Sequence, residues 1–203
     1  MWKCLKRIMI CLLVVCLVWC GGLIADRTTL REELIRLHVV AASDSQEDQS
    51  LKLLVRDAVV ESLQSAMAEL TDPEAAKAYL RQQLPQIQLL AEHVLRELGC
   101  EDSVQVSLAL EEFGTRVYDT FTLPAGIYES LRIVIGEGAG QNWWCVVFPT
   151  LCVPATSDGF EDTAAGAGFS DSLTGALTGD EEYEVRFYLL DVLGNVENLL
   201  HRG

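Results

Sequence analysis

The first 25 residues constrain this chain more than any other feature. Lys3, Lys6 and Arg7 supply a basic start without any acid, and an apolar run follows from residue 8 to about Ala25. A basic start followed by an apolar core is typical of an export signal, and the basic end stays in the cytoplasm. The sequence therefore predicts that the rest of the chain is delivered to the far side of a membrane.

Two interpretations of residues 1–25 stay open. The sequence Leu23-Ile24-Ala25 has a small residue only at its last position, so it is not a clean cleavage site. The apolar run is also about the minimum length that can span a bilayer as a helix. We favour a cleaved signal peptide over a retained membrane anchor. Membrane contact through the N-terminal segment is expected only if that segment is uncleaved.

The acidic character of the chain excludes some partners. The net charge is -15, and because residues 1–25 hold three bases and no acid, the remainder carries -18. Nucleic acid is not an expected partner, since phosphate binding needs a basic surface. Anionic lipid headgroups would repel the same surface.

Three cysteines remain after the N-terminal segment: Cys100, Cys145 and Cys152. An exported location permits a disulfide. Pro149 can turn the chain between Cys145 and Cys152, which makes these two the candidate pair. Three reduced, partly buried thiols are the alternative. Because the sequence has no Cys-x-x-Cys motif and no Cys/His ligand spacing, we expect no metal and no cofactor.

Hydrophobic periodicity predicts a single α+β domain over residues 30–153. The run 34–41 is typical of a buried strand, and apolar stripes at helical spacing predict two helices that end near Leu70 and Leu98. Alternating patterns over 104–148 then predict about four strands. We expect an antiparallel β-meander with the two helices packed on one face.

The rest of the chain has two different compositions. Residues 154–182 are mostly small and acidic, contain no base, and are predicted to form a flexible acidic insert. Residues 183–203 regain apolar periodicity and are predicted to form a strand leading into a helix that packs on the domain.

A few polar side chains could carry chemistry. His38 and Asp44, with Cys145 as a nucleophile, would make an exported hydrolase if they lay within hydrogen-bond reach. No nucleophile elbow, HExxH or paired-carboxylate motif is present. A histidine on an apolar strand is more often a hydrogen-bonded core residue, so we do not expect an enzyme. On the first helix, Lys52 and Arg56 fall outside the apolar stripe and should be solvated.

The sequence Gln141-Asn142-Trp143-Trp144 is the most unusual local feature. Adjacent tryptophans on a strand point to opposite faces. One can enter the core, while the other is either covered by the helices or offered to a partner as an anchor. The glycine loop 136–140 before it lacks the Lys-Ser/Thr of a P-loop and is predicted to be a hairpin turn.

Two segments together resemble the stage II sporulation protein R family of endospore-forming Firmicutes. They are IRLHVVAASDSQEDQSLKLLVRDAV (35–59) and LPAGIYESLRIVIGEGAGQNWWCVVFPTLC (123–152). The resemblance covers about residues 30–153. It departs from the family pattern at Ala42, where an Asn is expected, and the segment 154–182 has no clear counterpart.

This resemblance implies an intercellular signalling protein exported across the forespore membrane into the intermembrane space. There it would activate a membrane-embedded aspartic protease, leading to processing of a sporulation sigma-factor precursor. The candidate partner-binding residues are those that match the family segments: His38, Ser43, Asp44, Asp48, Gln49, Glu137, Gln141, Asn142, Trp143 and Trp144. Besides the hydrolase, a septal structural protein anchored by residues 8–25 is an alternative.

Overall fold

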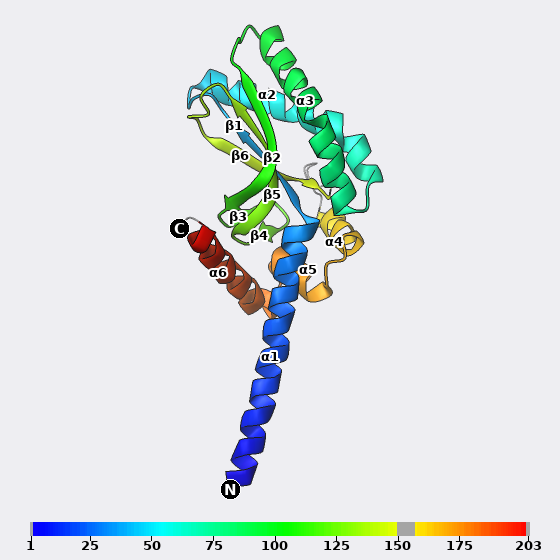
Figure 1. The fold of residues 1–203 in the computed structure, drawn as a ribbon, viewed down its shortest axis with the longest axis vertical. Coiled ribbons are helices and arrows are strands. Elements are labelled where there is room, and N and C mark those ends of the chain that lie inside the picture. The colour runs from blue at the N-terminus through cyan, green and yellow to red at the C-terminus, as the bar shows by residue number, and fades with distance from the viewer. Residues whose placement is uncertain (1, 150–156, 202–203) are drawn as a thin grey trace.

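The computed structural model describes residues 2–149 and 157–201. Its helices are α1 (Trp2–Glu33), α2 (Gln46–Glu69), α3 (Pro73–Glu97), α4 (Ser157–Gly166), α5 (Asp171–Thr178), the short η1 (Glu181–Tyr183) and α6 (Glu184–His201). Its strands are β1 (Ile35–Val40), β2 (Val104–Phe113), β3 (Arg116–Val117), β4 (Thr122–Leu123), β5 (Gly126–Ile135) and β6 (Asn142–Phe148). Figure 1 shows a domain from which α1 projects as a long stalk.

The main sheet is mixed, which corrects the predicted antiparallel β-meander. Its strand order is β2-β5-β1-β6, with β1 parallel to β5 and antiparallel to β6. The strands β5 and β6 are consecutive in the chain but are separated in space by β1. The turn between them crosses the end of β1, where the Gly140 amide donates to the Ala41 carbonyl at 3.0 Å. The strands β3 and β4 form a separate two-stranded sheet.

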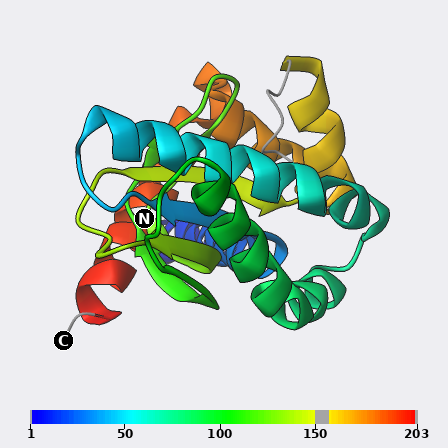
Figure 2. The same ribbon diagram turned by 90° about the horizontal axis from the view of Figure 1, so that it is seen from above.

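One face of the main sheet packs against α2 and α3. Side chains at alternate positions, such as Leu37 and Val39 of β1 and Leu131 and Ile133 of β5, form a buried core with both helices. This alternation follows from the twofold periodicity of a strand. Seen from above, α2 and α3 lie together over the sheet (Figure 2). The helix α3 begins at its N-cap Asp72 and runs through Pro85 as one element.

The opposite face of the sheet contributes to a second buried core. Tyr128 and Val146 reach it from the sheet, and the end of α1 adds Leu30. The helices α4 and α5 add apolar side chains that include Phe160 and Leu173. The structure thus differs from the flexible insert expected over 154–182, because these spaced apolar side chains are buried and hold the two helices. Residues 154–156 lie outside the described part.

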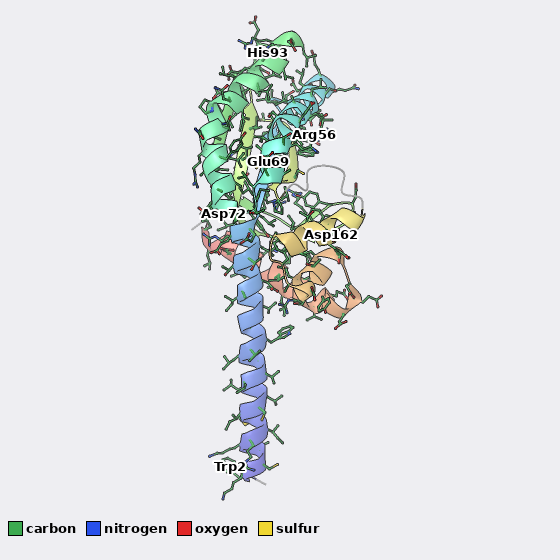
Figure 3. All side chains as sticks on the ribbon, turned by 90° about the vertical axis from the view of Figure 1, so that its right-hand side faces the viewer. Trp2, Arg56, Glu69, Asp72, His93 and Asp162 are labelled. Atoms are coloured by element: carbon green, nitrogen blue, oxygen red, sulfur yellow. The ribbon has the colours of Figure 1, made fainter. Side chains whose placement is uncertain are left out.

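The helix α1 continues without a break from the apolar N-terminal run into the domain. Most side chains from Trp2 to Ile24 are exposed, whereas Asp26 and Leu30 are buried. Trp2 lies at the free end of the stalk (Figure 3). By length and composition α1 could cross a membrane, a property that signal sequences share.

The C-terminal segment is helical over its described part, with no strand before α6. Leu190, Gly194 and Asn198 form its buried face. An ion pair between Arg186 of α6 and Asp26 of α1, at 2.6 Å, joins the two helices.

Candidate functional site

Five of the predicted partner-binding residues meet at one end of the sheet. Ser43 donates from its hydroxyl to the Asp48 carboxylate, and Gln49 donates from Nε2 to the Ser43 carbonyl at 2.8 Å. Asp44 accepts a hydrogen bond from the Gln141 amide at 2.7 Å. The chain leaving β1 is therefore tied both to the start of α2 and to the β5–β6 turn. We call these five residues the turn cluster.

Lys52 of α2 links two members of the turn cluster through hydrogen bonds. Its Nζ donates to Gln49 Oε1 at 2.5 Å and to the Gln141 carbonyl at 3.0 Å. The side chain is buried, so the expectation that it is solvated is wrong. Burial lowers the pKa of Lys52, and the nearby Arg56 charge lowers it further. The apolar stripe of α2 does not predict this burial, because the long lysine side chain can cross the edge of the stripe to reach a carbonyl.

Gly140 permits the close approach that the turn cluster requires. A Cβ at this position would lie 2.2 Å from the Ser43 carbonyl oxygen, which is a backbone atom that cannot turn away. The hairpin turn expected over 136–140 therefore also packs against the segment that follows β1. No larger residue fits there without displacing one of them.

Three predicted residues on this side are open to solvent. Glu137, Gln141 and Asn142 are exposed on the β5–β6 turn and at the start of β6. They form a polar surface, and hydrogen bonds with Asp44 and Lys52 hold the backbone at Gln141.

His38 and Trp144 lie on the sheet face away from α2 and α3. They are opposite each other in the β1–β6 pairing, and their rings stack with centroids 5.7 Å apart. The Arg116 guanidinium covers the indole at 3.5 Å from its centroid. His38 and Arg116 therefore cover much of the Trp144 ring, which is only partly exposed, and this favours a packing role for it.

Glu111 of β2 is the partner of His38, and sequence reasoning missed it. His38 Nδ1 lies 3.1 Å from Glu111 Oε2, and Arg132 Nη1 lies 3.1 Å from the other carboxylate oxygen. Burial would raise the pKa of Glu111, but the hydrogen bond with His38 and the positive charge of Arg132 lower it overall. Glu111 lies in a segment whose alternating pattern predicts a strand. The sequence does not show the strand register that places Glu111 beside His38.

Trp143 points to the opposite face of the sheet, as the adjacent-tryptophan argument predicts. It packs at the edge of the core formed with α2 and α3. The Arg56 guanidinium lies 4.6 Å from its ring centroid. The predicted solvation of Arg56 thus holds only for part of its side chain. Figure 3 shows its position on α2.

Arg36 is a third residue whose role sequence reasoning missed. It is fully buried, with its guanidinium 3.9 Å from the Phe113 ring centroid, and it donates from Nη2 to the Tyr118 hydroxyl at 2.8 Å. An arginine inside an otherwise apolar strand was the available signal. It supports the second core through its stacking on the ring.

The residues proposed for a hydrolase are not brought together. Cys145 is buried in the core against α2 and α3, whereas His38 lies on the other face of the sheet. Asp44 is engaged by the Gln141 amide. Cys152 lies outside the described residues, so its pairing with Cys145 stays a prediction. Within 2–149 and 157–201, no group of three or more His, Cys, Asp or Glu side chains is placed to hold a metal ion.

Comparison with known proteins identifies the family. The sequence profile described as Stage II sporulation protein R matches residues 31–158. The chain belongs to the stage II sporulation protein R family. A relative of that name from Bacillus subtilis (strain 168) is 38% identical over 128 residues, which cover 63% of this chain and 57% of the relative. No solved structure gives a significant match.

The stage II sporulation protein R match includes the main sheet, α2, α3 and the whole turn cluster. It stops before α5 and α6. The chain spans little more than half the length of its curated relative. Family membership supports a role in sporulation, and the matched region includes the turn cluster, in which Asp44 and Gln141 are exposed.

Proposed function

We propose that this chain is an exported sporulation signal that activates a membrane-embedded aspartic protease, which then processes a sigma-factor precursor. Membership of the stage II sporulation protein R family is the observation that carries the proposal. An apolar N-terminal helix supports the export step. The protein acts as a ligand and performs no cleavage itself.

The surface proposed for protease binding is the exposed rim of the turn cluster. Gln141 and Asn142 present exposed side-chain amides there, and Glu137 is exposed on the same turn. Their backbone is held by Asp44 and Lys52. A ligand shifts an equilibrium only as far as it binds one state more tightly, so this surface must fit the active protease better than the inactive one.

The test is reconstitution in a host that does not sporulate. This protein, the candidate protease and the sigma-factor precursor are expressed together, and precursor cleavage is followed by blot. The test variant is Gln141→Ala/Asn142→Ala, which removes two exposed side chains and leaves the backbone hydrogen bonds of Gln141 in place. The matched control is Gln105→Ala, an exposed amide on β2 at the other edge of the sheet.

The proposal predicts cleavage that requires this protein and its N-terminal segment. The double variant should reduce cleavage about tenfold or more, as expected when contacts worth about 1.4 kcal/mol are lost, while the control stays at the wild-type level. Melting temperatures should be unchanged in both. Absence of cleavage with exported, folded wild-type protein would reject protease activation. Equal activity of the double variant would reject only this surface.

Trp144→Ala separates recognition from packing. Because the indole packs against His38 and Arg116, its removal should lower the melting temperature and reduce activity together. A stable but inactive Trp144→Ala protein would instead assign this side chain to the protease contact.

A further inference from the structure

The helix α6 is amphipathic, but most of its apolar side chains face solvent and many of its polar side chains face the domain. At 3.6 residues per turn, an arc of roughly 140° holds only apolar side chains. They are Val185, Tyr188, Leu189, Val192, Leu193, Val196, Leu199 and Leu200. Seven of these eight are exposed, and Tyr188 and Leu200 keep 65% and 76% of their surface open. A helix in a globular protein normally turns such an arc toward the core.

The polar residues of α6 point inward and explain this orientation. Arg186 pairs with Asp26, and Glu197 pairs with Arg27 of α1. Asp191 accepts from the Ala125 amide at 2.7 Å, and Asn198 donates to the Phe113 carbonyl at 2.8 Å. His201 lies 3.3 Å from Glu112. These bonds fix α6 with its apolar arc facing away from the domain.

The position of α6 beside α1 indicates what covers the arc. The exposed apolar surface of α1 ends at Ile24, and Arg186 at the start of α6 pairs with Asp26 just beyond it. A Cβ on Gly22 would lie 3.5 Å from the Arg186 guanidinium. In Figure 1, α6 lies below the sheet on the side of the stalk, while α3 lies at the far end. The arc therefore begins where α1 would leave a bilayer.

We propose that the outer face of α6 binds the extracytoplasmic leaflet of the membrane that α1 enters. The tilt that spanning helices commonly show, about 20°, helps to bring this face to the surface. Burial of apolar side chains drives the contact, as for other interfacial helices. Tyr188 suits the boundary because its ring is apolar and its hydroxyl is polar. Since the arc carries no charge, binding needs no anionic lipid. This proposal applies to the chain that retains α1 as its anchor, and it does not depend on the protease.

The test uses the full chain reconstituted in phosphatidylcholine vesicles, with fewer chains than vesicles. An environment-sensitive fluorescent amino acid replaces Val192 in one variant and Asn195 in a second. Asn195 is the matched control, because it is exposed on the same helix but lies outside the arc. A third variant carries the probe at His93, which lies at the end of the domain away from the stalk (Figure 3). Lipids with a spin label near the glycerol end of the chain serve as quenchers.

The proposal predicts blue-shifted emission and several-fold stronger quenching at position 192 than at 195, and none at 93. Because the domain is acidic, adding phosphatidylglycerol should not strengthen the quenching. A probe at Leu199 repeats the measurement if the Val192 variant does not fold. Red, unquenched emission at both arc positions would overturn the proposal. Blue-shifted but unquenched emission would also overturn it, and its growth with protein density would point to a second copy of the chain.

Discussion

Glu111 offers a residue-scale test through its charge. Glu111→Gln keeps the shape but should lower the free energy of unfolding at pH 7 by about 1–3 kcal/mol, since hydrogen bonds to a charged group are lost. Because the folded-state pKa of Glu111 is lowered, this contribution is present above its ordinary pKa of about 4.3 and disappears as the pH falls through the lowered value. The wild type and the variant should therefore converge in acid.

Chemical unfolding of the full chain in detergent, followed by near-ultraviolet circular dichroism, measures this difference. Glu97→Gln is the control, because Glu97 is exposed and paired only across a helix surface with His93. It should change the stability little at any pH. A gap between wild type and Glu111→Gln that stays constant from neutral to acidic pH would contradict the assignment.

At this scale the sequence predicts residue types better than contacts. The polar residues around Ser43 and Gln141 stand out because they flank a helix start and a glycine turn, and the structure brings them together. Lys52, Glu111 and Arg36 escape notice because their roles depend on which strand lies beside which. A buried charge is recognised only once its partner in another segment is known.

At the scale of elements, the docking of α6 depends on Gly194. A Cβ there would lie 1.7 Å from the Ala125 carbonyl oxygen. In an isolated helix Gly→Ala stabilises by about 0.5–1 kcal/mol, so a destabilised Gly194→Ala protein would reveal the close approach. We expect a loss of about 2 kcal/mol or more in thermal unfolding, because a backbone atom must move.

Gly166→Ala is the matched control for this experiment. It lies in α4 with no atom within 4 Å of an added Cβ, so it should be neutral or slightly stabilising. If Gly194→Ala behaves like Gly166→Ala, α6 does not pack as closely on Ala125 as the structure indicates.

Local patterns predicted the helices and strands well but not their arrangement. The twofold and 3.6-residue periods locate β1, α2 and α3, because each has one face in the core. Strand order is set by long-range pairing, so β1 between β5 and β6 could not be inferred from the nearest turns. The segment with α4 and α5 was misjudged on composition, since a few apolar side chains such as Phe160 and Leu177 suffice to hold short helices.

For the whole molecule, the basic N-terminus should set the orientation across the membrane. Lys3→Gln/Lys6→Gln/Arg7→Gln removes the charges that keep this end in the cytoplasm. With alkaline phosphatase fused to the C-terminus, this variant should lose several-fold activity, because the enzyme folds only outside the reducing cytoplasm.

The control for orientation removes as many positive charges from the domain. Arg81, Arg96 and Arg132 lie on its exposed surface, and their change to Gln should leave phosphatase activity unaltered. An equal loss in both variants would mean that total charge matters and that the N-terminal location does not.

On the export route proposed above, the central place of β1 has a consequence for passage through a translocation channel. This strand leaves the channel first, yet Ile35 pairs with Glu129 and Phe148, which emerge long afterwards. Such distant pairing makes folding slow, because the intervening chain must be closed into a loop. The sheet cannot close while most of the chain is still in transit. On this route the topology delays closure of the sheet until the chain as far as Phe148 has been threaded.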